Sequence, residues 1–131
     1  MDLNQLKAQI QQWGRELGFQ QIGIADKDLH AEEAQLKAWL AKGYQGQMNW
    51  MSAHGNKRFR PGELEPGTLR VISARMDYLP PDTQPVKLLQ QKDKAYVSRY
   101  ALGRDYHKLI RKRLATLAAR IREEVADSQL A

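Results

Sequence analysis

Apolar residues recur every three or four positions at the start of the chain. This spacing places them on one face of an amphipathic helix, and the positions concerned are Leu3, Leu6, Ile10, Trp13 and Leu17. Asp2 is a suitable residue to cap the start of this helix, and Gly18 can end it in a left-handed turn. The next stretch, residues 19–25, alternates in part and contains Ile22 and Ile24. It therefore predicts a strand.

A second helical pattern covers residues 30–42. Asp28 is a suitable N-cap and Gly43 ends the pattern, and the residues expected to face inward are Leu36, Trp39 and Leu40. Beyond this helix, a cluster of large apolar residues between glycines indicates a short helix at Met48, Trp50 and Met51. Residues 57–67 contain two prolines and two glycines. We expect them to be mostly irregular.

The second half of the chain predicts one strand and one long helix. Residues 68–78 have the alternation and β-branched content of a strand, whereas residues 79–94 contain three prolines and predict a long loop. Asp105 can cap a helix that runs to about residue 125, with a buried stripe expected at Leu109, Ile110, Leu114, Leu117, Ile121 and Val125. The other positions of this helix carry Lys108, Arg111, Lys112, Arg113, Arg120 and Arg122. Helices flanking a small sheet predict an α+β fold, with one domain over residues 1–131.

Composition narrows the functional classes. The chain of 131 residues has no cysteine, which excludes disulfides, thiolate zinc sites and a self-contained iron–sulfur cluster. No apolar run approaches the roughly 20 residues that span a bilayer, and the first residues lack the pattern of a signal peptide. We expect a soluble, cytoplasmic protein with no membrane partner. The net charge of +6 suits a nucleic-acid contact as well as a solvated basic surface.

The run from Tyr96 to His107 is the most distinctive segment of the sequence. It combines two arginines, three tyrosines and a histidine in twelve residues, just before a predicted helix. Arginines bind phosphate in bidentate fashion and tyrosine rings stack on flat ligands. The segment therefore suits a nucleotide, a tetrapyrrole-like ring or RNA. A capped helix start with amphipathic tyrosines explains Asp105, Tyr106 and His107 without any ligand.

A second informative segment is the basic loop at residues 54–70. Such a loop either carries binding residues or is a solvated turn; Arg58 lies in it, where a charged side chain has little core to support. The three histidines have no metal-ligand spacing, so no metal site is expected. Ser98 has no base beside it in the sequence, and no GxGxxG, Walker-type or GxSxG motif is present.

Several runs together resemble the epoxyqueuosine reductases in order and spacing. They are Trp13–Phe19, Ile22–Ala25, Met48–Met51, Arg58–Pro61, Pro66–Ser73 and Tyr96–His107. The resemblance covers essentially the whole chain, and the last two runs are its specific part.

This resemblance implies the N-terminal portion of a nitroreductase-like, cobalamin-processing-like catalytic domain. In the family, a ferredoxin-like module with two four-iron four-sulfur clusters and a helical repeat region follow that domain. The enzyme reduces epoxyqueuosine to queuosine at the wobble position of a tRNA anticodon, with cobalamin as cofactor. We expect the family's proton-donor aspartate and cluster cysteines to lie beyond residue 131. The chain would then hold no catalytic residue and would be inactive alone.

The resemblance also implies site residues. Arg58 matches an arginine that contacts the corrinoid, and Ser98 matches a position beside the corrin. Candidate contacts to cofactor or tRNA in the same motif are Arg99, Tyr100, Arg104 and Tyr106. Two alternatives stay open: a stand-alone basic RNA-binding module that uses the last helix, and a corrinoid-binding domain without reductase activity. The electron donor and the oligomeric state are not implied.

Overall fold

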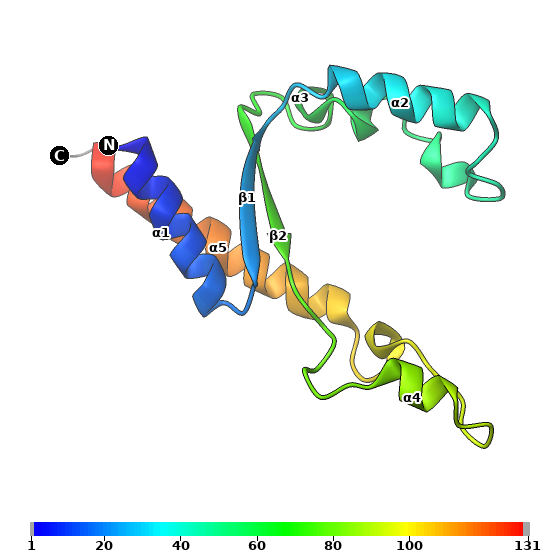
Figure 1. Cartoon of the computed structure of the whole chain (residues 1–131). Coiled ribbons are helices and arrows are strands. Elements are labelled where there is room, and N and C mark those ends of the chain that lie inside the picture. Colours follow the sequence, from blue (N-terminus) through cyan, green and yellow to red (C-terminus); the bar gives the residue numbers. More distant parts are fainter. Residues whose placement is uncertain (1, 130–131) are drawn as a thin grey trace. The chain divides into compact units, whose positions relative to one another are not determined.

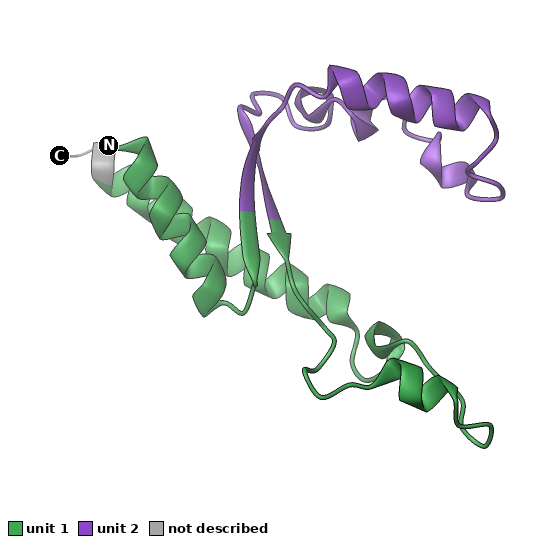
Figure 2. Cartoon of the chain, in the orientation of Figure 1, with its two compact units in different colours: residues 1–22, 74–131 green, residues 23–73 purple. Residues whose placement is uncertain are grey.

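The computed structural model describes residues 2–129, which form two compact units (Figures 1 and 2). Unit 1 consists of the described residues up to Ile22 and from Ala74 onward, and unit 2 is Gly23–Ser73. Strands β1 (Gln21–Asp26) and β2 (Arg70–Arg75) are hydrogen-bonded neighbours in one two-stranded sheet, and each strand crosses the boundary between the units. Helices with one small sheet confirm the α+β class.

Unit 1 begins with helix α1 (Leu3–Glu16), whose two ends are as predicted. The Asp2 carboxylate accepts a hydrogen bond of 2.9 Å from the Asn4 N–H, which caps the first turn. Gly18 has a φ of +82°, the left-handed conformation that glycine adopts most easily. The core of this unit contains Ile10 of α1, Phe19 just before β1, Ile22 of β1 and Leu117 of the last helix, all of which are buried.

Helix α5 (Tyr106–Gln129) lies beside α1 in unit 1 (Figure 1). It continues beyond the predicted end near residue 125. Its buried stripe is narrower than predicted, because Leu109 and Leu114 are 44% and 38% exposed. The face turned inward is centred on Leu117, and Ile110 and Ile121 are half-buried beside it. Leu109 and Leu114 lie on the two flanks of this face, where no described element covers them fully.

Unit 2 contains helix α2 and three shorter helical segments, with bounds α2 (His30–Ala41), η1 (Asn49–Met51), η2 (Gly55–Arg58) and α3 (Pro61–Leu64). The cap of α2 is Leu29, not the predicted Asp28, although the Asp28 carboxylate accepts a hydrogen bond of 3.2 Å from the His30 N–H. The predicted inward residues of α2 are half-buried. The segment expected to be irregular, residues 57–67, contains the end of η2 and all of α3. Helix α3 can begin there because Pro61 fits the first turn of a helix.

Two short helices lie between β2 and α5. Helix α4 (Pro85–Leu89) interrupts the predicted long loop, again with a proline in its first turn. Helix η3 (Arg99–Ala101) lies in the distinctive tyrosine-rich run. Among the described residues, no helix is both long and apolar enough to cross a membrane.

Candidate functional site

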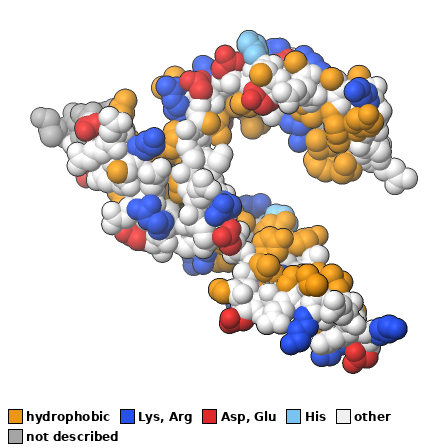
Figure 3. All heavy atoms as spheres, viewed as in Figure 1, with side chains coloured by type: hydrophobic (Ala, Val, Ile, Leu, Met, Phe, Trp, Pro, Cys, Tyr) orange, Lys and Arg blue, Asp and Glu red, His pale blue; other side chains and the backbone are white. Residues whose placement is uncertain are grey.

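A hollow with a volume of about 380 Å³ lies in unit 1 and is lined by three tyrosines. We call it the tyrosine hollow, and its lining residues are Met76, Tyr78, Tyr100, Tyr106 and Ile110. The ring of Tyr100 meets the rings of Tyr78 and Tyr106 edge to face, with centroids 6.2 Å apart in both pairs. Figure 3 shows hydrophobic side chains gathered on the surface between α4 and the start of α5.

Local backbone features bring these tyrosines together. In η3, the Ala101 N–H donates to the Ser98 carbonyl at 2.9 Å, which folds Tyr100 into a tight turn. Gly103 then adopts a φ of +86°, a conformation that favours glycine, and redirects the chain toward α5. Tyr106 is the first residue of that helix. The run of residues 96–107 is therefore compact because of its turn and its glycine.

Asp105 and His107 fix the start of α5. The Asp105 carboxylate accepts a hydrogen bond of 2.9 Å from the His107 N–H and lies 2.8 Å from Nδ1 of the same residue. The His107 ring also stacks on Tyr106 with centroids 4.0 Å apart. The His107 side chain and then its N–H lower the pKa of the Asp105 carboxyl. These contacts confirm the predicted capped start of the helix.

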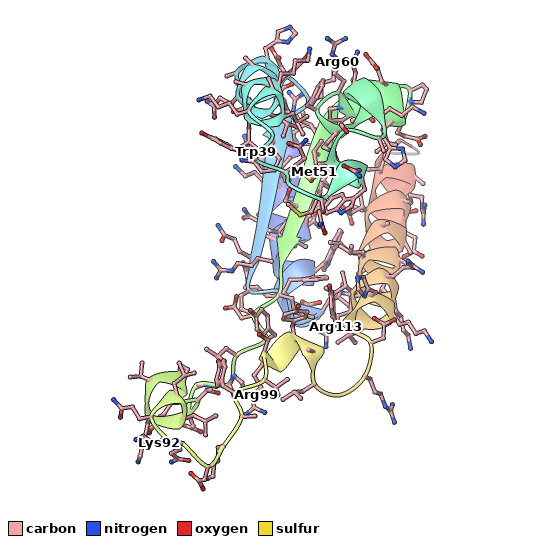
Figure 4. All side chains as sticks on the ribbon, turned by 90° about the vertical axis from the view of Figure 1, so that its right-hand side faces the viewer. Trp39, Met51, Arg60, Lys92, Arg99 and Arg113 are labelled. Carbon is pink, nitrogen blue, oxygen red and sulfur yellow. The ribbon has the colours of Figure 1, made fainter. Side chains whose placement is uncertain are left out.

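Arg113 lies behind one wall of the tyrosine hollow. Its Nη1 donates to Sδ of Met76 at 3.2 Å, and its guanidinium lies against Gly18 (Figure 4). The sequence placed Arg113 with the other basic residues on the outer positions of the helix, but it is half-buried. Its spacing from the inward-facing residues could have predicted this burial. Ile110 lies three residues before Arg113 and Leu117 lies four residues after it, so all three share one face of the helix.

The tyrosine hollow contains two of the six residues expected at the site. Tyr100 and Tyr106 line it together with Tyr78, which sequence reasoning did not single out because it ends a predicted strand. Arg99 is exposed and lines separate hollows with residues of the α4 region, including Leu88. Ser98 and Arg104 are exposed in the same segment and do not line the tyrosine hollow.

Arg58 belongs to unit 2 and holds its loop together. Its Nε donates to the Met51 carbonyl at 2.9 Å and its Nη2 to the Trp50 carbonyl at 2.8 Å. The guanidinium also lies 5.4 Å from the centroid of the Trp50 ring, a cation–π distance. Arg58 is exposed, as its loop position suggests, but it also makes hydrogen bonds within the loop that the sequence did not indicate. Its contact with a corrinoid stays a prediction.

Glu33 forms an ion cluster in unit 2 that the sequence did not indicate. Glu33 as a residue is only 7% exposed. Its carboxylate accepts two hydrogen bonds from Arg60, at 3.0 and 3.1 Å. Lys37 donates to the same carboxylate, and Arg60 (Figure 4) also pairs with Glu63. Arg60, and after it Lys37, lower the pKa of Glu33 to about 2, and Glu33 raises the pKa of Arg60. The cluster joins α2 to α3.

The chemistry of the tyrosine hollow is that of a binding surface. Its walls are apolar with phenol groups, and its volume lies within the range of about 300–1,000 Å³ typical of small-molecule sites. A nucleobase fits such a space, whereas a corrinoid is larger and could place only one edge there. Among residues 2–129, no three His, Asp or Glu side chains gather as a set of metal ligands.

Comparison with known proteins gives a consistent result. Residues 58–130 match the family described as "Epoxyqueuosine reductase QueG, DUF1730". The epoxyqueuosine reductase of Pseudomonas aeruginosa is 64% identical over 124 residues, which are 95% of this chain and 34% of that protein. The corresponding proteins of Vibrio cholerae and Escherichia coli are 57% and 58% identical over 95% and 94% of this chain.

The chain spans about a third of the length of these relatives: 34% for the Vibrio cholerae protein and 32% for the Escherichia coli protein. No solved structure matches the chain.

Proposed function

Because the chain belongs to the epoxyqueuosine reductase family, we propose that it forms part of an enzyme that reduces epoxyqueuosine to queuosine in tRNA. The observation that carries this proposal is the 64% identity to the Pseudomonas aeruginosa reductase over 95% of the chain. A tRNA substrate would place the enzyme in the cytoplasm. The proposal is tested by exchanging the matching third of that protein for this chain and assaying the hybrid for reduction of epoxyqueuosine in tRNA.

Within such an enzyme, the chain would provide binding surface for cobalamin and tRNA. It contains no cysteine, so ligands for iron–sulfur clusters would have to come from outside this chain. The chemistry that cobalamin supplies when bound is reduction of the substrate. The α+β arrangement would be the N-terminal portion of a nitroreductase-like, cobalamin-processing-like domain, a proposal that rests on the family match.

The side chains fit part of a corrinoid. The tyrosine hollow offers apolar walls to the edge of a flat ring, and Ser98 lies two residues before Tyr100. In unit 2, Arg58 uses two N–H groups on backbone carbonyls, and a guanidinium carries further N–H donors for an amide or phosphate oxygen. Within unit 1 the tyrosine hollow and Ser98 would bind one edge of the cofactor, and Arg58 in unit 2 is a separate candidate contact. Arg99 and Arg104 are exposed and would suit tRNA phosphates.

The cofactor site is tested by replacing one wall of the tyrosine hollow. In the purified hybrid, Tyr100→Ala removes the ring that meets both other tyrosines and should lower the corrin content, read from its absorbance. Tyr44→Ala is the matched control, because Tyr44 is exposed in unit 2 and lies outside this hollow. Equal corrin content in both variants would show that the tyrosine hollow does not hold the cofactor.

A further inference from the structure

Positive charge is concentrated in one segment of unit 1. From Arg99 to Arg122, eight residues are lysine or arginine, and only Asp105 is acidic. Two of the eight are engaged with the rest of the unit. Arg113 donates to Met76, and Arg120 pairs with Glu16 at 2.7 Å, which also lowers the pKa of that glutamate.

Four of the remaining basic residues share one exposed face of α5. We call this face the basic strip, and its members are Lys108, Arg111, Lys112 and Arg122. At about 100° per residue, they fall within an arc of roughly 100°. This arc is opposite the buried stripe around Leu117. Among the described residues, none of these four side chains makes a hydrogen bond or an ion pair, and only the Arg111 side chain acts at longer range, on Asp105.

The positions between these charges carry no large apolar side chain. The intervening positions of the same face are occupied by Ala115 and Ala119, and Ala118 borders it. With a rise of about 1.5 Å per residue, Lys108 and Arg122 lie roughly 21 Å apart along the helix axis. Small alanine side chains between the charges allow a chain of phosphates to approach the helix closely.

We propose that the basic strip binds the phosphate backbone of the tRNA substrate. The identity of the partner rests on the proposed function, whereas the surface follows from charge and exposure. A membrane is disfavoured because the centre of the apolar stripe of α5, around Leu117, is turned into the unit, and an interfacial helix needs that stripe for the bilayer. A protein partner is disfavoured because the strip has no large apolar or aromatic side chain to form the core of an interface. Phosphate contacts need charge alone.

The test compares two triple variants of the 131-residue chain that lose the same charge. Lys108→Ala/Arg111→Ala/Lys112→Ala removes most of the strip and keeps a strong helix former at each position. Lys87→Ala/Lys92→Ala/Lys94→Ala is the control, because these lysines are exposed in and after α4, away from the strip. Binding is measured to an RNA hairpin with a tRNA anticodon stem and loop and an unmodified wobble base, at several salt concentrations. Circular dichroism establishes that both variants are folded.

The strip variant should bind the hairpin about 10- to 100-fold more weakly than the parent chain near 0.1 M salt. The slope of log K against log salt should become shallower by about 2, since each lost contact contributes roughly 0.7 to 0.9. The control variant should change affinity by less than about threefold. Equal losses in the two variants would overturn the proposal, because net charge alone would then explain binding.

Two competitors distinguish other partners. Polyglutamate that binds the strip as tightly as the hairpin does would indicate an acidic protein, and anionic lipid vesicles that bind while the hairpin does not would indicate a membrane. Either result overturns the proposal. The hairpin carries no queuosine-type base and the assay contains no cobalamin, so the outcome is independent of reduction. Loss of corrin or of turnover in the hybrid would count against the proposed function and leave the strip measurement intact.

Discussion

At the scale of single residues, Arg58 shows how an exposed charge stabilises a loop. Its two hydrogen bonds to the carbonyls of Trp50 and Met51 join η1 to η2. We expect Arg58→Ala to lower the free energy of unfolding by about 1–2 kcal/mol, because charge-assisted hydrogen bonds to the backbone are lost. Chemical denaturation measures this change. Lys57→Ala is the control; it should change stability by no more than about 0.5 kcal/mol.

The same variant bears on the corrinoid. In the hybrid enzyme, Arg58→Ala should also weaken cobalamin retention, by about ten- to a hundredfold if one charge-assisted hydrogen bond is lost. Full corrin content together with a lowered stability would show that Arg58 serves the loop alone. Unchanged stability would contradict the role that its two hydrogen bonds indicate.

Because of Glu33, the free energy of unfolding of the chain should depend on pH in the acidic range. Folding lowers its pKa from 4.5 to about 2, chiefly through Arg60 and then through Lys37. Below pH 4.5 the unfolded chain therefore binds a proton that the folded chain does not, so stability falls as the pH is lowered from 4.5 toward 2. Glu33→Gln should be less stable than the parent chain at pH 7, and this difference should shrink across that window.

Denaturant unfolding of both proteins at several pH values between 7 and about 2 provides the measurement. The difference between them isolates Glu33, because Glu16, Asp26 and Asp105, whose pKa values are also lowered, titrate in both. A difference that stays constant down to pH 2 would show that the ion pair with Arg60 does not persist in solution.

At the scale of elements, the fit of α1 onto β1 depends on a glycine. A Cβ at Gly14 would clash with Cγ1 of Ile22 and would lie 2.7 Å from its Cδ1. Overpacking of this kind costs about 1–3 kcal/mol, which exceeds the gain of up to about 1 kcal/mol from replacing a helical glycine by alanine. Gly14→Ala should therefore destabilise the chain, as measured by chemical denaturation.

Gly62→Ala is the matched control, because nothing lies within 4 Å of its added Cβ and its φ is not positive. It should be neutral or slightly stabilising. In addition, Ile22→Ala removes the clashing atoms, so the double variant should be more stable than the sum of the two single effects predicts. Strict additivity would mean that Gly14 and Ile22 are not in contact.

The elements show what sequence reasoning can and cannot predict. The first and last helices were predicted with their caps, because Asp2 and Asp105 act on N–H groups two residues away. The exposure of a side chain, in contrast, depends on residues distant in the sequence that cover it. For this reason the helical pattern predicts Leu109 and Leu114 as buried and Arg113 as exposed, and the structure differs at all three.

The candidate site shows the same limit. Tyr100 and Tyr106 were predicted as site residues because they share one short run, whereas Tyr78 joins them from a separate segment. Glu33 and Arg60 lie 27 residues apart in the sequence, so no local sequence pattern predicts their ion pair. Cofactor and tRNA contacts at Arg58, Ser98, Arg99 and Arg104 stay predictions.

At the scale of the whole molecule, the two features that stand out among the described residues are a charged surface and an aromatic hollow. Both features lie in unit 1, and the tyrosine hollow includes the first residue of the helix that carries the basic strip. This arrangement agrees with the tRNA contact that we propose for the basic strip. The family match over residues 58–130 includes η3, α5 and all five residues that line the tyrosine hollow.

The most direct test of the central claim uses a bacterial strain that lacks its own epoxyqueuosine reductase. The strain expresses the Pseudomonas aeruginosa protein with its matching third replaced by this chain, and nucleosides of its tRNA are quantified by mass spectrometry. The account predicts that the hybrid converts epoxyqueuosine to queuosine, whereas the 131-residue chain expressed alone does not, because it has no cysteine to hold an iron–sulfur cluster. A hybrid that is folded and abundant but leaves epoxyqueuosine in the tRNA would contradict the account.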